Sequence, residues 1–247
     1  MLLTMSLLGW AGCSIGQGFV EPTQFGWGRG DPDSTHYEWD DFSSASGDNA
    51  PDISADPADV AGILPNVIET TGTAFITSTG NIYSLNTVVE FEITVPAFEL
   101  PGGTTDVVLQ TRTQGREIDE TTILANGQPP VETIELFRFE LGPDDIFGGF
   151  LVDVVHRFEV DSSNPVVIEF AASDTSLSLD RVAVDTRTRE SVGCPADVNG
   201  DGFVNPGDFN AWVIAFNTQA PECDQNGDGL CNPGDFNAWV LNFNSGC

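Results

Sequence analysis

The stretch "TVVEFEITV" occupies residues 87–95, and its pattern decides the fold of the larger part of the chain. Apolar Val89, Phe91, Ile93 and Val95 alternate with residues that are mostly polar. Alternation with a period of two residues is typical of a β-strand that buries one face and exposes the other. We therefore predict a half-buried strand at this position.

Further short stretches rich in β-branched and aromatic residues recur between residues 66 and 190. They are "FITS" (75–78), "DVVLQTR" (106–112), "ETIELFRFE" (132–140), "FLVDVVHRFEV" (150–160), "PVVIEFAA" (165–172) and "LSLDRVAVDT" (177–186). Turn-forming sequences rich in Gly, Pro, Asn and Asp separate them. Residues 19–65 are expected to form loops with one or two edge strands. The predicted fold class is mainly β, with an antiparallel β-sandwich of the jelly-roll type over residues 19–190.

The C-terminal part of the chain contains a repeat. "DVNGDGFVNPGDFNAWVIAFN" (197–217) and "DQNGDGLCNPGDFNAWVLNFN" (224–244) agree at 16 of 21 positions. In each copy a loop precedes apolar residues at helical spacing, namely Phe209, Trp212, Val213 and Phe216 in the first, and Phe236, Trp239, Val240 and Phe243 in the second. We predict two loop-then-helix units that bury these stripes against each other. The identity of exposed positions indicates either two similar outer faces that both serve in binding or a recent duplication of the segment.

Each loop carries oxygen-bearing residues at alternating positions, the arrangement that a calcium ion requires. Positions 1, 3, 5, 9 and 12 supply side-chain oxygens, position 7 supplies a backbone carbonyl, and glycine at position 6 permits the sharp turn. The predicted ligands of two Ca²⁺ ions are Asp197, Asn199, Asp201, Phe203, Asn205 and Asp208 in the first loop, and Asp224, Asn226, Asp228, Leu230, Asn232 and Asp235 in the second.

The chain is strongly acidic, with 38 acidic residues against 8 basic ones and a formal net charge of −30. Nucleic acids and anionic membrane surfaces are bound through clusters of Lys and Arg, so this composition argues against both as partners. No apolar stretch reaches the ~20 residues of a transmembrane helix, so no integral membrane span is expected.

The first 18 residues have an apolar segment followed by small residues, as in a secretory signal peptide that is cleaved, or lipidated at Cys13. Export makes disulfides favourable, and four further cysteines lie in the last 54 residues. We expect the pairs Cys194–Cys247 and Cys223–Cys231, although four cysteines allow three pairings. The protein is predicted to be secreted or at the cell surface.

Residues 194–247 resemble a dockerin domain of the GC type, on the evidence of two "DxNGDGxxNPGDFNAWV" units and the closing "SGC". The resemblance implies a small calcium-dependent anchoring module that binds a cohesin-like protein. Where cellulosomal dockerins usually carry Ser or Thr, at loop positions 10 and 11, this chain has Pro and Gly. The expected partner is therefore a cohesin-like or other cell-envelope protein. More weakly, residues 19–190 resemble jelly-roll modules of secreted surface proteins.

The sequence offers no recognised catalytic motif, and we expect a non-enzymatic protein. His156 is predicted to face the core of a strand, and His36 to lie in a loop without a partner. The carboxylates of Glu90 and Glu92 are expected on a solvated strand face. A hydrolase acting on polysaccharide, with Glu90/Glu92 or Asp144/Asp145 as its carboxylate pair, is the catalytic alternative.

Carbohydrate binding is the other alternative function. Trp27, Tyr37 and Trp39 lie close together in the sequence and would form a sugar-stacking platform if their rings were exposed. Aromatic residues of this kind serve more often as core residues. Exposure of the three rings therefore distinguishes a polysaccharide-binding module from a plain structural core.

Overall fold

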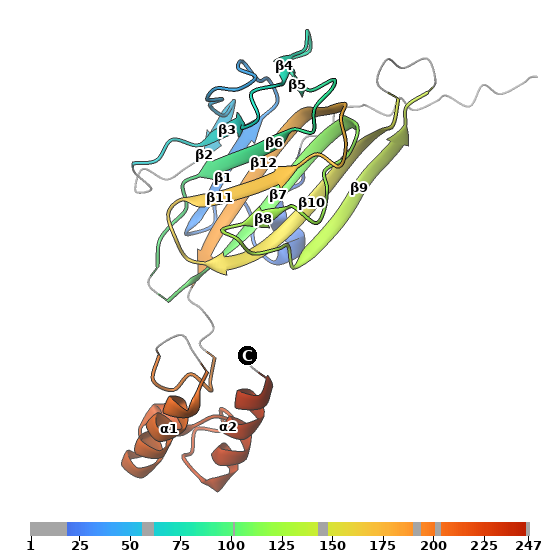
Figure 1. Cartoon of the computed structure of the whole chain (residues 1–247). Coiled ribbons are helices and arrows are strands. Elements are labelled where there is room, and N and C mark those ends of the chain that lie inside the picture. Colours follow the sequence, from blue (N-terminus) through green and yellow to red (C-terminus); the bar gives the residue numbers. More distant parts are fainter. Residues whose placement is uncertain are drawn as a thin grey trace, which may run out of the picture.

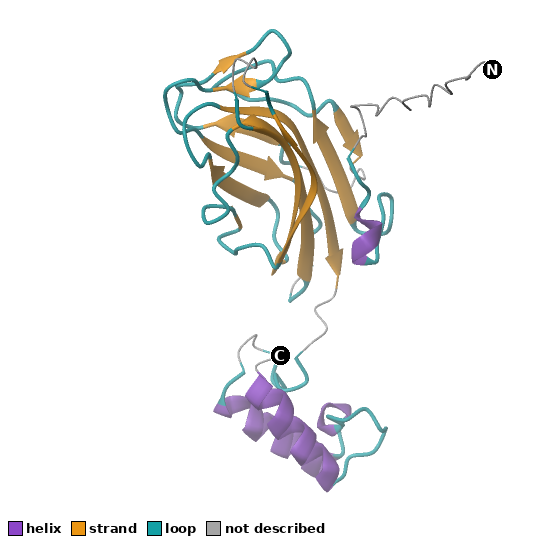
Figure 2. Ribbon diagram, turned by 90° about the vertical axis from the view of Figure 1, so that its right-hand side faces the viewer, coloured by secondary structure: helices purple, strands orange, loops and turns teal. Residues whose placement is uncertain are grey.

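The computed structural model describes residues 19–55, 62–100, 102–142, 148–189, 194–200 and 204–245. Strands β1 to β12 lie between Ser34 and Arg189, and two α-helices follow near the C-terminus. Figures 1 and 2 show the strands as two stacked sheets, and the helices as a separate pair. The prediction of a mainly β chain with a small helical module is confirmed. The predicted signal peptide, including Cys13, and residues 190–193 lie outside the described residues.

The larger sheet has the order β2-β1-β12-β7-β10-β9, and all of its pairings are antiparallel. The short strands β4 and β5 extend it beside β12 (Figure 1). Its strands are β1 (Ser34–Trp39), β2 (Ile53–Ala55), β4 (Phe75–Ile76), β5 (Ile82–Tyr83), β7 (Thr104–Gly115), β9 (Glu132–Glu140), β10 (Phe150–Asp161) and β12 (Leu177–Arg189).

The smaller sheet has the order β3-β6-β11-β8 and is also antiparallel. Its strands are β3 (Asn66–Glu69), β6 (Glu90–Val95), β8 (Leu124–Ala125) and β11 (Val166–Ala171). From β6 to β9 and again from β10 to β12, successive strands alternate between the two sheets. The chain therefore wraps around the core as it does in a jelly roll. The hairpin β9–β10, which stays within the larger sheet, departs from this alternation.

The core lies between the two sheets and confirms the alternation in "TVVEFEITV". Phe91, Ile93 and Val95 are 2%, 0% and 0% exposed, whereas Glu90 and Glu92 of the same strand are exposed or half-exposed. Phe91 stacks on Phe170 of β11 with ring centroids 5.1 Å apart. Burial of such side chains is the main source of stability for a sandwich of this size.

The outer face of the larger sheet is covered by the N-terminal segment. The 3₁₀-helix η1 (Pro22–Phe25) leads to Trp27, which packs against Val108 of β7 and Val155 of β10. Arg29 then pairs with Asp185 of β12, with its Nε 2.8 Å from Oδ1.

One or two edge strands were predicted within residues 19–65, and β2 is one. The prediction is wrong for β1, which lies between β2 and β12 in the sheet.

The helical part consists of α1 (Pro206–Thr218), the 3₁₀-helix η2 (Pro221–Cys223) and α2 (Pro233–Ser245). It has its own apolar cluster around Ala196, Trp212 and Trp239, which shares no residue with the cluster between the sheets. Among the described residues, no helix combines the length and the apolar content needed to cross a bilayer.

Candidate metal centre in the C-terminal repeats

Both helices begin with the same reciprocal cap. Asn205 Oδ1 accepts a hydrogen bond of 2.7 Å from Gly207 N, while Asp208 Oδ2 accepts one of 2.8 Å from Asn205 N. Proline at the first helical position suits this geometry, because its missing N–H would have no partner there. In α2 the same bonds join Asn232 to Gly234 and Asp235 to Asn232, each at 2.7 Å. The repeated "NPGD" is therefore a helix start as well as part of each loop.

The second loop winds around the carboxylate of Asp224. Asp224 Oδ1 accepts from Gly227 N at 2.9 Å and from Asp228 N at 3.1 Å, and Oδ2 accepts from Gly229 N at 2.8 Å. Gly227 and Gly229 have φ angles of 74° and 79°, in the left-handed region that favours glycine. These positive φ values let three successive N–H groups turn toward one side chain.

Three of the six predicted ligands of the second loop lie close together. Asp224, Asp228 and Asp235 each offer a carboxylate oxygen, and these oxygens lie within 4.8 Å of one another. Calcium binds oxygen at about 2.3–2.6 Å, so ligands on opposite sides of one ion are about 5 Å apart. The spacing of the three carboxylates therefore fits a single ion of this size. Asp235 is 0% exposed, Asp224 is half-buried and Asp228 is exposed, so the cluster lies at the surface with one of its carboxylates buried.

The remaining predicted ligands of the second loop have other partners as well. Asn226 Oδ1 accepts from Asp228 N at 2.9 Å. Asn232 uses its Oδ1 for the helix cap and places Nδ2 3.4 Å from Asp228 Oδ2. The backbone carbonyl of Leu230, which is the predicted ligand of this residue, lies 3.5 Å from Asn232 Nδ2. The geometry thus gathers the three aspartates most clearly, while Asn232 acts as a helix cap.

The first loop repeats this arrangement as far as the structure describes it. Asp208 is 0% exposed, and its Oδ1 accepts from Asn199 N at 3.2 Å. The equivalent bond in the second loop joins Asn226 N to Asp235 Oδ1 at 3.4 Å. Asp197 is half-buried at the start of the loop. The predicted ligands Asp201 and Phe203 lie outside the described residues.

The two units hold each other through a reciprocal pair of hydrogen bonds. Trp212 Nε1 of α1 donates to Cys223 O at 3.2 Å, and Trp239 Nε1 of α2 donates to Ala196 O at 3.3 Å. Each acceptor is the residue immediately before the other unit's loop. Trp212 packs on Phe236 at 5.5 Å and Trp239 on Phe209 at 5.3 Å between ring centroids. The bonds and ring contacts exchange under a pseudo-twofold axis, as the repeat predicts.

A disulfide closes the second loop. Cys223 and Cys231 are bonded, with Cα atoms 5.6 Å apart, which confirms this part of the predicted pairing. The bond joins the residue before loop position 1 to loop position 8. Cys194 is disulfide-bonded too, and its predicted partner Cys247 lies outside the described residues. The first loop carries Ala196 and Val204 where the second has its two cysteines.

The predictions for the two histidines of the sandwich have different outcomes. His156 is fully buried on the core face of β10, as predicted, with Nε2 2.9 Å from Glu120 Oε2, while its buried Nδ1 has no hydrogen-bond partner among the described residues. The prediction for His36 is wrong, because this residue lies on β1 and has two partners. Its Nε2 and Nδ1 are each 2.8 Å from a carboxylate oxygen, of Glu38 and Asp185 respectively. The partner on β12 is distant in sequence and becomes a neighbour only when β1 pairs with β12.

The proposed sugar-stacking platform is not exposed. Trp27, Tyr37 and Trp39 are 4%, 0% and 0% exposed, so their rings serve as core residues on the two faces of the larger sheet. Glu90 and Glu92 lie on the open side of β6, as expected for a solvated face. The other considered carboxylate pair, Asp144 and Asp145, lies outside the described residues.

Comparisons of the chain with protein-family models, with curated proteins and with solved structures found no match. The geometry of the loops, the helices that they cap and the sequence pattern are therefore the features that bear on function.

Proposed function

We propose that this chain is a secreted or cell-surface protein that attaches to a partner in the cell envelope through a calcium-dependent module formed by residues 194–247. The β-sandwich would be the body that is anchored, without catalytic activity. The observation that carries the proposal is the convergence of Asp224, Asp228 and Asp235 within 4.8 Å. The dockerin-like sequence pattern supports a cohesin-like or other envelope protein as the partner.

Calcium would act on the module through the charges of its loops. Three carboxylates held this close repel one another, and a divalent cation replaces that repulsion with attraction. The ligand Asp235 also caps α2 and bonds the loop backbone at Gln225 N, at 3.1 Å. Cation binding would therefore stabilise the loop and the helix start together, so that binding free energy becomes folding free energy.

The test is a capture experiment with the full chain. The immobilised protein is exposed to native cell-envelope proteins in calcium and in a chelator, and the bound protein is quantified. We expect capture in calcium only, and its loss in the double variant Asp224→Asn/Asp228→Asn. Asp174→Asn, which removes an exposed carboxylate of the sandwich, serves as the matched control and should capture normally. Equal capture with and without calcium would contradict the proposal.

A further inference from the structure

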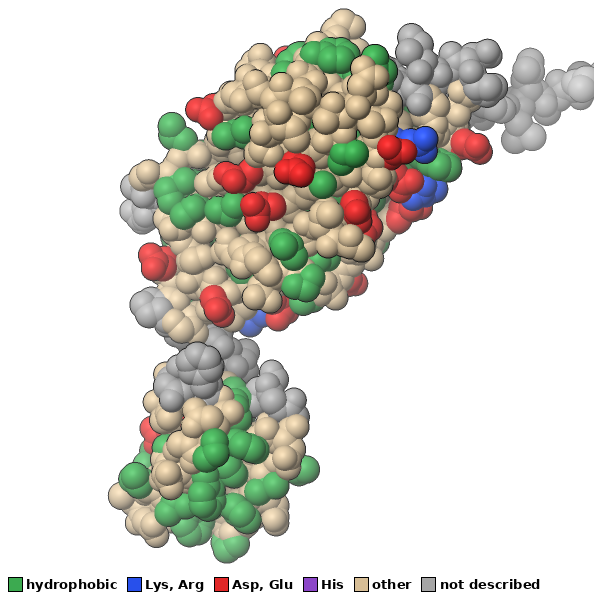
Figure 3. All heavy atoms as spheres, viewed as in Figure 1, with side chains coloured by type: hydrophobic (Ala, Val, Ile, Leu, Met, Phe, Trp, Pro, Cys, Tyr) green, Lys and Arg blue, Asp and Glu red, His purple; other side chains and the backbone are tan. Residues whose placement is uncertain are grey.

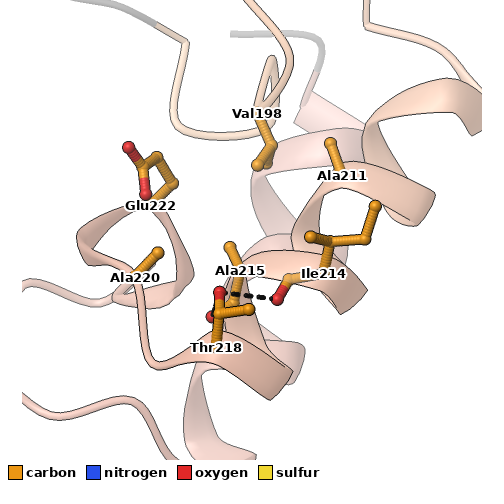
Figure 4. A pocket seen from close by; sticks show the side chains of 7 residues that line it. All are labelled: Val198, Ala211, Ile214, Ala215, Thr218, Ala220 and Glu222. Atoms are coloured by element: carbon orange, nitrogen blue, oxygen red, sulfur yellow. Dashed lines mark hydrogen bonds between the residues drawn. The ribbon is translucent and has the colours of Figure 1, made fainter.

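An open apolar pocket lies beside α1. It has a volume of about 280 Å³ and is lined by Val198, Ala211, Ile214, Ala215, Thr218, Ala220 and Glu222. Figure 4 shows the side chains of Ala211, Ile214 and Ala215 along the helix, facing Val198 from the preceding loop. The connection between α1 and η2 forms the opposite wall, with Glu222 at its edge. Ile214 is 65% exposed, so a large aliphatic side chain stands at the rim without cover.

The equivalent surface of the second unit is lined by different residues. The repeats differ at five positions, and three of them line this pocket: Val198, Ile214 and Ala215 are replaced by Gln225, Leu241 and Asn242. Asn242 Nδ2 donates to Gln225 Oε1 at 3.3 Å and lies 3.5 Å from Gln225 O. Two polar side chains, bonded to each other, thus replace the apolar wall. Leu241 is 70% exposed, but it stands beside an amide pair instead of an apolar recess.

We propose that the module docks through the α1 face alone, and that the partner inserts an apolar side chain beside Ile214 and places a Lys or Arg against Glu222. This inference depends on the proposed function and specifies its partner. An apolar anchor entering a recess loses more water contact than one placed on the Gln225–Asn242 pair, where amide groups would lose hydration. The near-identity of the repeats predicted two similar faces, and the pocket distinguishes them.

The charge of the module supports a basic partner. Residues 194–247 contain seven acidic residues and no Lys, Arg or His. Six of the seven occupy predicted calcium-ligand positions, and Glu222 is the exception. Its carboxylate is exposed and makes no ion pair among the described residues. With calcium in the loops, Glu222 would be the one side-chain carboxylate of the module left to pair with a partner.

A second copy of this chain is a poor occupant of the pocket. Two copies would each bring a formal net charge of −30, and the approaching module would offer no cation for Glu222. Figure 3 shows apolar side chains gathered over the helical module, whereas acidic side chains are spread over the visible face of the sandwich. The module thus combines an apolar surface with a carboxylate, Glu222, that requires a basic partner group. Both features favour a different protein, rather than a second copy, as the occupant of the pocket.

The experiment compares two substitutions at pseudo-twofold related positions in the full chain. The protein captured from the cell envelope in calcium is identified, purified and used as the probe in calorimetric titrations. We expect Ile214→Asp to weaken binding at least about tenfold, and Leu241→Asp to change it less than about twofold. Glu222→Gln should weaken binding and reduce its dependence on salt concentration. Circular dichroism in calcium checks that each variant keeps its helices, which is expected because both side chains are exposed.

The other possible outcomes contradict the inference, and each one identifies the part of the proposal that is wrong. If wild-type protein captures nothing in calcium, the proposed function fails and the inference fails with it. If capture depends on calcium but Leu241→Asp weakens binding as much as Ile214→Asp, the function stands and the single docking face is wrong. If sedimentation in calcium shows a dimer that Ile214→Asp abolishes, the occupant is a second copy. A captured partner whose binding is unaffected by Glu222→Gln contradicts the basic contact.

Discussion

Asp208 and Asp235 each connect a loop to the helix that follows it. Each is fully buried. One oxygen of each carboxylate accepts a hydrogen bond from a loop N–H, and the other accepts one from the backbone N–H of the helix-capping asparagine. A carboxylate with these roles is needed even when no cation is bound, because its loss would leave buried N–H groups without acceptors. Substitutions at this position therefore cannot separate metal binding from folding. Asp228, which is exposed, can.

Replacing Asp228 by Asn should reduce calcium affinity without disturbing the fold of the loop. Asp228 Oδ1 accepts from Leu230 N at 2.9 Å, and an asparagine oxygen can keep that bond. The change removes one of the three converging charges, so we expect calcium affinity of the second loop to fall about tenfold or more, which is ~1.4 kcal/mol. Calorimetric titration of calcium measures it. Glu222→Gln, outside both loops, is the control, and an unchanged affinity in Asp228→Asn would refute the site.

Asp180 provides a pH-dependent prediction for the sandwich. It occupies the irregularity in the pairing of β12 with β7, and burial raises the pKa of its carboxyl despite the nearby Arg112 and Arg181. A raised pKa means that the folded state holds the proton more tightly than the unfolded state does. The charged form therefore costs stability at neutral pH, and this cost disappears as pH falls below the ordinary Asp value of about 3.9.

Asp180→Asn should therefore stabilise the sandwich at neutral pH and not at low pH. The expected rise in Tm at pH 7 is on the order of 1 °C, because the carboxyl is partly solvated and also attracts Arg112. The advantage should shrink as pH falls toward 3. Thermal melts of both proteins across this pH range measure the difference. A Tm that is lower in the variant at pH 7 would show that the attraction to arginine outweighs burial.

At the scale of elements, the sequence predicted what depends on local periodicity. "ETIELFRFE" was predicted as a strand, and β9 has the same bounds. Its exposure could not be predicted, because it depends on β9 being an edge strand of the larger sheet. Phe137 and Phe139 are consequently 41% and 57% exposed. The partners of His36 were missed for the same reason, since Asp185 comes from the far end of the sandwich sequence.

The candidate metal centre was more predictable than the sheet order. Its ligands lie within twelve consecutive residues, so their approach depends on local turns and on glycine at fixed positions. The pocket beside α1 was missed, although a signal for it exists in the sequence. Three of the five positions at which the repeats differ line that pocket, and a comparison of differences rather than identities would have indicated it.

The Cys223–Cys231 disulfide should make the two loops unequal in calcium affinity. It limits the conformations that the second loop has without a cation, and the first loop has Ala196 and Val204 in its place. Closing a loop of this length restricts the unfolded chain by roughly 2–3 kcal/mol. In the variant Cys223→Ala/Cys231→Ala we expect weaker calcium binding at one of two sites. Stepwise calorimetric titration separates the sites, and an equal loss at both would show that the effect is global.

At the scale of the whole molecule, the chain should unfold in two independent steps. The cluster between the sheets and the cluster of the helical module share no residue, so each part has its own core. Calcium bound at 100 times its Kd stabilises the module by about 2.7 kcal/mol and has no predicted site in the sandwich. Scanning calorimetry should therefore show two transitions, and calcium should raise only the module's, by roughly 20 °C. The variant Phe91→Ala tests the other part, because it opens a cavity in the sandwich core that costs about 3–5 kcal/mol. It should lower the Tm of the calcium-insensitive transition and leave the other unchanged. A single transition that responds to both calcium and Phe91→Ala would instead show that the sandwich and the module unfold as one cooperative unit.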